Sequence, residues 1–347
     1  MQASTLTRLL AGAAVAALPY AAQAVDLTGA GATFPAPVYA KWAEAYKAKT
    51  GHAINYQAIG SGGGVKQIKA KTVDFGASDD PVSGDELQKD GLVQFPAVIG
   101  GVVPVVNVAG VEPGKMVLDA DVLAAIFSGK VAKWNDPAIA KLNPSLKLPN
   151  QAITPVYRSD SSGTTAVFTG YLAEIAPAFG KDVGAGKTVD WPAGVGGKGN
   201  AGVAANVMKL KGAIGYVEYA FAKQNKLSHT ALVNRDGRTV QPDENSFAAA
   251  AANADWKQAP GFGISLNNQP GADAWPITSA SFILMHRKPV DAQRSTEVLK
   301  FFRWALEDGG AMAKELDYVP LPANTVKLIE GAWKEIEGIG SLSVASK

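Results

Sequence analysis

A polar turn set between a short strand and a helix is the feature that most constrains the fold of this chain, and residues 153–173 show it most clearly. The apolar run of the expected strand ends at Tyr157, and apolar residues return with helical spacing from Val167. Strand, turn and helix in direct succession form the building unit of α/β domains. The pattern therefore predicts an α/β fold whose polar turns lie at the ends of strands.

The turn at residues 158–164 carries side chains that suit either of two roles. Ser162, Gly163 and Thr164 fall at the expected helix start, where unpaired backbone N–H groups and the positive end of the helix dipole favour an anion. Arg158 adds a planar guanidinium that matches oxyanions. The alternative is that these residues only cap the helix, and the segment taken alone favours that simpler role.

Three earlier segments repeat the same order of elements. Thr33 and Phe34 precede an amphipathic helix expected to extend through Lys49, Ser61 follows a strand, and Asp79 ends another strand. In open α/β sheets, ligands bind beyond the carboxyl ends of the strands. We therefore expect Thr33, Ser61 and Asp79 to gather at one edge of a sheet.

The glycine-rich run at residues 60–64 admits two interpretations. It lies between an expected strand at residues 54–59 and an expected helix at residues 65–71. A flexible linker has this composition, but a linker does not normally separate a strand from a helix inside a domain. We interpret the run as a turn that presents Ser61 as a hydrogen-bond donor.

The order of the segments predicts two lobes with two crossings between them. An apolar run at residues 95–107 leaves the first α/β block, and a return strand is expected at residues 275–285. Two closing helices are expected to pack back on the first block, at residues 291–306 and 323–336. The predicted lobes are residues 25–103 plus 280–347, and residues 104–279, with a cleft at the hinge between them.

The composition of the chain excludes several classes of protein. Its 33 Lys and Arg residues against 31 Asp and Glu give a formal net charge of +2, which is too balanced for a nucleic-acid or anionic-lipid partner. The absence of cysteine removes thiolate metal sites and cysteine nucleophiles. The three histidines are widely spaced, and no G-x-S-x-G elbow is present. We therefore expect no metal, no cofactor and no nucleic acid.

Two glycine-rich runs imitate nucleotide-binding loops without matching them. In residues 180–188, five residues instead of four separate Gly180 from the Gly-Lys-Thr ending, and no apolar strand precedes the run. Residues 196–200 lack the Ser or Thr that follows the lysine of such a loop. The sequence therefore does not predict a P-loop.

Residues 1–24 have the layout of a secretory signal. Arg8 precedes an apolar stretch, and an Ala-x-Ala cleavage site ends at Ala24. The apolar part is too short to span a membrane, and no later stretch is long enough to do so. We expect cleavage after Ala24 and export of a soluble protein to the periplasm.

Six motifs together resemble the periplasmic phosphate-binding proteins of bacterial phosphate ABC transporters. They are residues 28–42, Gly60-Ser61 with its glycines, residues 73–79, Arg158-x-Asp-x-Ser-Gly-Thr164, residues 196–200 and residues 212–219. The resemblance covers nearly all of the chain after the signal. It implies a type II, two-lobed "Venus flytrap" that closes on one inorganic phosphate. It also implies a monomer without enzymatic activity that delivers phosphate to membrane permease and ATPase subunits.

The resemblance also implies a set of phosphate ligands, and every position of the set matches in this chain: Thr33, Phe34, Ser61, Asp79, Arg158, Ser162, Gly163 and Thr164. Asp160 would hold Arg158 in place. The chain departs from the family beside these positions. Gly62 stands where enteric relatives have a second serine, and Tyr157, Ser159 and Ser161 differ around Arg158.

Net charge alone does not explain how such a site holds a dianion. Arg158 is offset by Asp79 and Asp160, so helix N-termini and hydroxyl groups must replace the hydration shell. Asp79 would accept the proton that HPO₄²⁻ carries and sulfate lacks, which disfavours sulfate. Two alternatives are a receptor for another tetrahedral oxyanion, such as sulfate or molybdate, and a secreted phosphatase, which would need an added nucleophile, base or metal.

Overall fold

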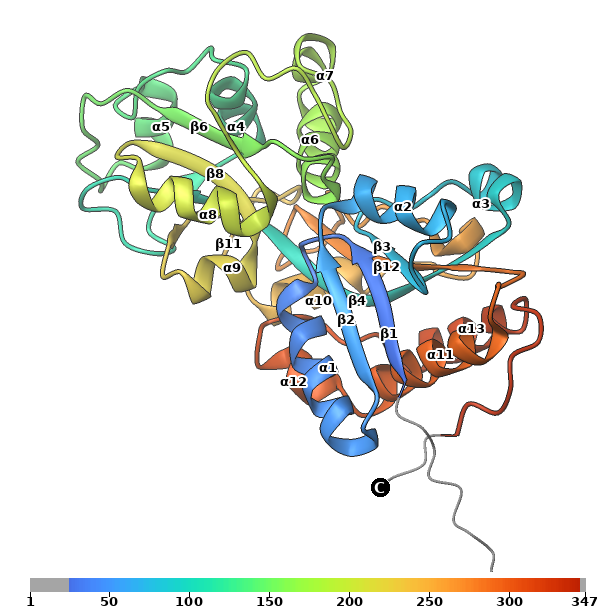
Figure 1. Ribbon diagram of the computed structural model, residues 1–347. Coiled ribbons are helices and arrows are strands. Elements are labelled where there is room, and N and C mark those ends of the chain that lie inside the picture. The colour runs from blue at the N-terminus through green and yellow to red at the C-terminus, as the bar shows by residue number, and fades with distance from the viewer. Residues whose placement is uncertain (1–24, 344–347) are drawn as a thin grey trace, which may run out of the picture.

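The computed structural model describes residues 25–343, so the expected signal at residues 1–24 lies outside the described residues. Figure 1 shows two groups of strands and helices joined by one long strand, β4 (Leu92–Val106). We call the group that holds the first strands and the last helices the first lobe, and the group built from the middle of the chain the second lobe. The predicted α/β, two-lobed fold class is confirmed.

The first lobe is built on a sheet with the strand order β2-β1-β3-β12-β4. The first three of these strands are parallel, and β12 runs antiparallel to both β3 and β4. The elements of this lobe are β1 (Asp26–Gly31), α1 (Ala36–Thr50), β2 (Ala53–Ala58), α2 (Ser61–Lys69), β3 (Phe75–Ser78), α3 (Gly84–Asp90), β12 (Thr278–His286), α11 (Ala292–Glu307), α12 (Gly310–Lys314) and α13 (Ala323–Trp333).

The second lobe continues the same sheet from the far half of β4 in the order β4-β8-β6-β7. A small three-stranded sheet, β11-β10-β5, lies beside it. The elements of this lobe are β5 (Val117–Leu118), α4 (Ala120–Phe127), α5 (Pro137–Leu142), β6 (Thr154–Arg158), α6 (Gly163–Ile175), α7 (Pro177–Asp182), β7 (Val195–Gly197), α8 (Gly199–Lys209), β8 (Ala213–Glu218), α9 (Tyr219–Gln224), β9 (Ser228–His229), β10 (Ala231–Val233) and β11 (Thr239–Val240).

The apolar run expected to leave the first block is the strand β4, which is buried along its whole length. It pairs with β12 up to Gly101 and with β8 from Val102 onward. On the way back, α10 (Glu244–Ala251) contacts β4 and β12, and the short helix η1 (Pro260–Phe262) contacts α3 and β4. The predicted residue boundaries of the lobes stay predictions.

The start of helix α2 corrects one expectation from the sequence. The run at residues 60–64 is not a turn before the helix, because α2 begins at Ser61 and Gly60 is its N-cap. Glycine serves here for close packing. A methyl group on Gly64 would lie 2.5 Å from the Cα atom of Gly31. The helix can therefore approach the strand this closely only because position 64 has no side chain.

The last helices pack on the first lobe, as the sequence predicts. The ring of Phe302 in α11 lies between Phe75 of β3 and Phe95 of β4, with centroid separations of 5.1 and 5.8 Å. The buried face of α1 consists of Val38, Tyr39, Trp42 and Tyr46, which includes the expected four-residue spacing. These side chains anchor α1 and α11 in the core of the first lobe.

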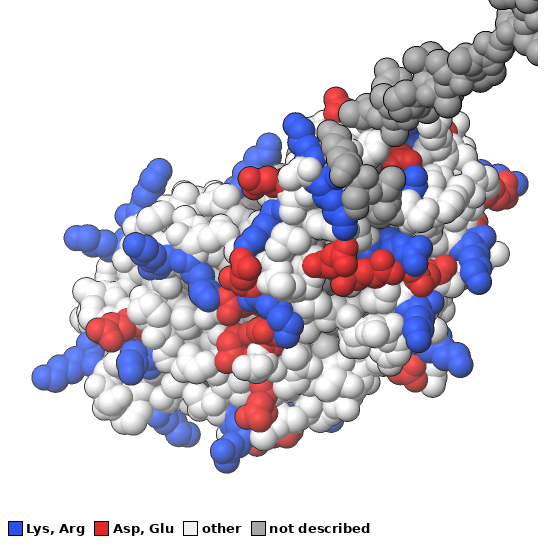
Figure 2. Space-filling view, turned by 90° about the horizontal axis from the view of Figure 1, so that it is seen from below, with Lys and Arg blue, Asp and Glu red and all other residues white. Residues whose placement is uncertain are grey.

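The surface carries charges of both signs. Figure 2 shows Lys and Arg interspersed with Asp and Glu over one face, in keeping with the balanced formal charge. Within residues 25–343, no helix combines the length and the apolar character that a membrane crossing needs.

Candidate functional site

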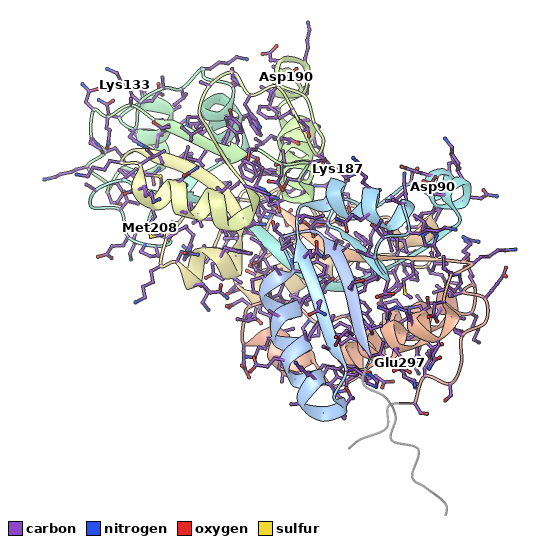
Figure 3. The ribbon with its side chains drawn as sticks, viewed as in Figure 1. Asp90, Lys133, Lys187, Asp190, Met208 and Glu297 are labelled. Carbon is purple, nitrogen blue, oxygen red and sulfur yellow. The ribbon has the colours of Figure 1, made fainter. Side chains whose placement is uncertain are left out.

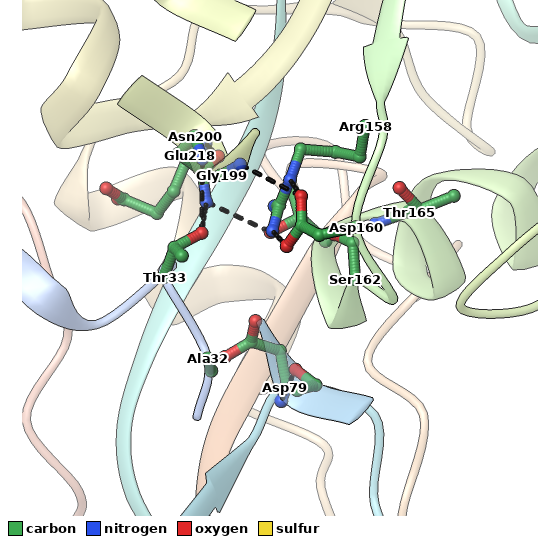
Figure 4. Close-up of polar contacts among 12 residues, drawn as sticks. Ala32, Thr33, Asp79, Arg158, Asp160, Ser162, Thr165, Gly199, Asn200 and Glu218 are labelled. Carbon is green, nitrogen blue, oxygen red and sulfur yellow. Dashed lines mark hydrogen bonds and ion pairs between the residues drawn. The ribbon is translucent and has the colours of Figure 1, made fainter. Parts of the chain in front are cut away.

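Buried polar side chains meet where strands of the two lobes end. Thr33 follows β1, Ser61 follows β2, Asp79 follows β3 and Arg158 ends β6. Their relative exposures are 6, 0, 1 and 5%. Buried polar groups of this kind need partners. Figure 4 shows the Asp79 carboxyl group directed toward the side on which Thr33, Arg158 and Asp160 lie.

Gly163 brings the two lobes into direct contact at this place. A methyl group on Gly163 would overlap the Ser61 hydroxyl and lie 2.8 Å from the Asp79 Cβ atom. Close by, the Gly62 N–H donates to the Ser161 carbonyl at 3.0 Å. The departures from the family at positions 62 and 161 therefore fall on one contact between the lobes. The structure brings together Ser61, Asp79 and Gly163, three of the residues that the resemblance assigns to one site.

Arg158 is held by two partners on its own lobe. Its Nε donates to Asp160 Oδ1 at 2.8 Å and its Nη2 to Asp160 Oδ2 at 2.5 Å, while Nη1 donates to the Thr164 hydroxyl at 3.2 Å. Burial alone would raise the pKa of Asp160, but the hydrogen bonds and charge of Arg158 outweigh it and lower this pKa. The contact between Asp160 and Arg158 that the resemblance implies is present.

Ser162 is the N-cap of α6, so the simpler role considered for this turn is observed. Its hydroxyl oxygen accepts from the Thr165 N–H at 3.0 Å. The hydroxyl of Ser61 likewise accepts, from the Asp79 N–H at 3.1 Å. A hydroxyl that accepts keeps its own hydrogen to donate. Capping and anion binding are therefore compatible, because both hydroxyl hydrogens and the first N–H groups of α6 stay available.

The two carboxyl oxygens of Asp79 differ: one accepts a hydrogen bond and the other has no partner. Its Oδ1 accepts from the Ser281 hydroxyl at 2.8 Å, and its backbone carbonyl accepts from the Ser279 hydroxyl at 3.0 Å. Its Oδ2 is buried without a hydrogen-bond partner among the described residues. Burial is the main cause that raises the pKa of Asp79 to about 7. When no anion is bound, this carboxyl group therefore holds a proton more tightly than an exposed aspartate does.

Thr33 is held by Asn200, a residue that sequence reasoning missed as a site residue. The Thr33 hydroxyl oxygen accepts from both the backbone N–H and the side-chain amide of Asn200, at 3.1 and 2.8 Å. Gly199 donates its N–H to Asp160. The Phe34 ring is fully buried. Residues 196–200, which fail as a nucleotide-binding loop, thus support the site from the second lobe.

Two signals in the sequence pointed to the missed residues. Asn200 closes a glycine-rich run at the start of a helix. Ser279 and Ser281 lie on either side of Ala280 in the buried strand β12, and hydroxyl groups inside a buried strand need partners. Only the fold shows that Asp79 is the partner of both serine hydroxyls.

The site offers many donors and one protonatable acceptor. Among the described residues, no group of three or more His, Cys, Asp or Glu side chains could hold a metal ion. The histidines lie elsewhere: His52 accepts from the Val25 N–H, His286 contacts the Ile68 carbonyl, and His229 packs edge-on against Tyr219. This arrangement suits the binding of a small, proton-bearing oxyanion.

Two lobes on a shared sheet, with an anion-type site where they meet, define the class of periplasmic binding proteins. A model of the PBP superfamily domain matches residues 18–308 of the chain. The chain is 54% identical to the phosphate-binding protein PstS of Pasteurella multocida over 90% of this chain and 91% of that protein, and 54% identical to PstS of Haemophilus influenzae over 91% and 95%. It belongs to the PstS family of phosphate-binding proteins.

Solved structures agree with this assignment at the level of the fold. A phosphate-binding protein from Stenotrophomonas maltophilia superposes with a TM-score of 0.71, at 20% identity, over 91% of this chain and 99% of that chain.

Proposed function

We propose that this protein captures inorganic phosphate in the periplasm and delivers it to a phosphate ABC transporter. The observation that carries the proposal is the unpaired, buried Oδ2 of Asp79, a proton acceptor set among the donors of two lobes. The PstS relatives are named phosphate-binding proteins, and their identity to this chain extends over nearly its whole length.

The proposed phosphate ligands surround one position between the lobes. The first lobe contributes the backbone at Thr33 and Phe34, the Ser61 hydroxyl and the Asp79 carboxyl group; the second lobe contributes Arg158, Ser162, Gly163 and Thr164. Asp160 orients the guanidinium of Arg158 without itself touching the anion. Hydrogen bonds to a charged partner contribute about 1.5–3 kcal/mol each, so several of them replace the lost hydration of phosphate.

Selectivity follows from the proton on the ligand. HPO₄²⁻ and H₂PO₄⁻ can donate to Asp79 Oδ2, whereas sulfate at neutral pH has no hydrogen to offer. An ionised carboxylate facing a sulfate oxygen is left repelled and unpaired. This mismatch disfavours sulfate, and the same carboxylate distinguishes the proposal from a receptor for other tetrahedral oxyanions.

Capture requires the lobes to open and close about β4 and the returning chain before β12. Phosphate binds the closed form because its ligands come from both lobes, and it shifts the population toward that form. We place the lobes at residues 25–103 plus 280–347 and residues 104–279. The protein acts as a monomer, reaches the periplasm through a cleaved signal at residues 1–24, and passes phosphate to permease and ATPase subunits.

The proposal makes the protein a receptor and not an enzyme. A phosphatase would need a nucleophile with a base, or a metal, beside the phosphorus atom. The described hydroxyl groups around Arg158 have no histidine beside them that could act as a base, because His52, His229 and His286 contact other residues.

Calorimetric titration with phosphate, sulfate and molybdate, together with a phosphomonoester turnover assay, tests this function. We expect one phosphate per chain, no heat with sulfate or molybdate, and no turnover. Tighter binding of sulfate or molybdate than of phosphate would contradict the proposed ligand. Sustained release of phosphate from the ester would contradict the assignment as a receptor.

A further inference from the structure

A buried carboxyl group behind the site is not used by the ligand set. Glu218 ends β8 of the second lobe, Tyr318 follows α12 of the first lobe, and neither has any exposed surface. The Tyr318 hydroxyl oxygen lies 2.6 Å from the Phe34 carbonyl oxygen and 2.7 Å from Glu218 Oε2. Three oxygen atoms thus form a chain of two short contacts across the lobes.

The number of protons in this chain is fixed by chemistry. A phenol carries one hydrogen, and a backbone carbonyl can only accept. If Tyr318 donated to an ionised Glu218, its oxygen would face the Phe34 carbonyl at 2.6 Å with no hydrogen between them. Two short contacts therefore require two protons, and the second can come only from the carboxyl group.

We propose that Glu218 is protonated in the folded protein and donates to Tyr318, which in turn donates to the carbonyl of Phe34. Glu218 then acts as a positioning residue for the turn at Thr33 and Phe34, where the first lobe meets phosphate; this role rests on the proposed function. Oε2 keeps a lone pair for the Ala220 N–H, which lies at 2.9 Å.

The surroundings of Glu218 favour its neutral form. Its Oε1 is buried without a hydrogen-bond partner among the described residues, which costs far less for a neutral carboxyl oxygen than for a carboxylate. Burial first, and then the charges of Asp317 and Asp79, raise its pKa well above the ordinary value. Lys223 on α9 is paired with Asp317 at 2.5 Å, and Tyr219 and Asn200 bring no charge.

A second path connects Glu218 to the same turn. Its backbone N–H donates to Asn200 Oδ1 at 2.9 Å, and the Asn200 amide donates to the hydroxyls of Thr33 and Thr164. The backbone and the side chain of Glu218 therefore both connect to residues of the site. Ionising its side chain would break the contact to Phe34 and leave a charge buried between the lobes.

Infrared difference spectroscopy of the phosphate-free protein tests the protonation directly. We expect wild type at neutral pH to show the carbonyl stretch of a buried carboxylic acid that is missing in E218Q and shifted in Tyr318→Phe. Absence of any such difference between wild type and E218Q would overturn the proposal. This measurement does not use phosphate, so it decides the protonation even if the protein does not bind phosphate.

Phosphate affinity tests the positioning role. Gln mimics the neutral acid, so we expect E218Q to bind phosphate within about twofold of wild type at neutral pH, and Tyr318→Phe and Glu218→Ala to bind about fivefold more weakly or worse. Rescue by Gln but not by Ala supports the neutral donor. A loss of about tenfold or more in E218Q would show that the ionised form is required, and would overturn the proposal.

Discussion

Lys187 of the second lobe forms an ion pair with Asp80 of the first, with 2.5 Å between Nζ and Oδ2. Figure 3 shows Lys187 where the two lobes meet. The carbonyl of Lys187 also accepts from the N–H of Ser162, the cap of α6. The Gly-Lys-Thr run that fails as a P-loop thus supports the cap of α6 and also reaches the residue next to Asp79.

Removing this ion pair should speed the release of phosphate. The pair is partly exposed and spans the lobes, so it stabilises only the closed form, by about 0.2–1 kcal/mol. We expect Lys187→Met to raise the dissociation rate by about 1.4- to fivefold at low salt, with a smaller effect at high salt. Stopped-flow release measurements check this. Lys130→Met is the control, because Lys130 pairs with Asp182 within the second lobe; an equal effect there would contradict a role in closure.

Replacing Asp79 by asparagine should relax the rejection of sulfate. The amide can donate a hydrogen to sulfate, whereas the carboxylate cannot. We expect Asp79→Asn to bind phosphate at least about tenfold more weakly and to bind sulfate measurably. Calorimetric titrations with both anions give the ratio, with Asp85→Asn in helix α3 as a control. Undetectable sulfate binding by Asp79→Asn would show that this carboxyl group does not discriminate between the anions.

The raised pKa of Asp79 predicts how stability changes with pH when phosphate is absent. The folded protein binds this proton more tightly than the unfolded chain, whose pKa is near 3.8, so stability is lost as the pH rises from there to about 7. The scale is about 1.4 kcal/mol per unit of pKa shift. We expect the free energy of unfolding of Asp79→Asn, relative to wild type, to increase over this window and then to level off. Chemical denaturation at several pH values measures the free energy of unfolding of both proteins. A difference between them that does not change with pH would contradict a raised pKa of Asp79.

A methyl group at position 163 should oppose closure. In Gly163→Ala the added carbon would overlap the Ser61 hydroxyl, and overpacking of this kind costs about 1–3 kcal/mol. We therefore expect phosphate affinity to fall by roughly five- to 150-fold. Gly170→Ala in the same helix is the matched control, since its nearest neighbour would lie at an ordinary 3.7 Å. Equal affinities for the two variants would exclude this contact between the lobes.

The sequence predicts those parts of the site that depend on neighbours along the chain. The order of strand, turn and helix places Thr33, Ser61, Asp79 and Arg158 at strand ends, because each depends only on a nearby turn. Local composition misplaced the start of α2: the glycines predicted as a turn belong to the helix, and Gly64 lets that helix lie against β1.

The contacts that complete the site join residues far apart in the sequence, so patterns of neighbouring residues do not predict them. Ser281 is 202 positions from Asp79, and Asn200 is 167 positions from Thr33. Such partners follow from the order of strands in the sheet, which a periodicity of 2 or 3.6 residues does not determine. The buried proton on Glu218 likewise depends on three segments meeting behind Phe34.

The continuity of β4 limits how the molecule can move. One uninterrupted backbone serves both halves of the sheet, changing partner between Gly101 and Val102. Gly101 has no room for a side chain, because a methyl group there would overlap the Phe247 ring. The two halves of the sheet share this one strand, so we expect any opening of the lobes to bend or twist β4 and to leave its ladder pairing with β12 and β8 unchanged.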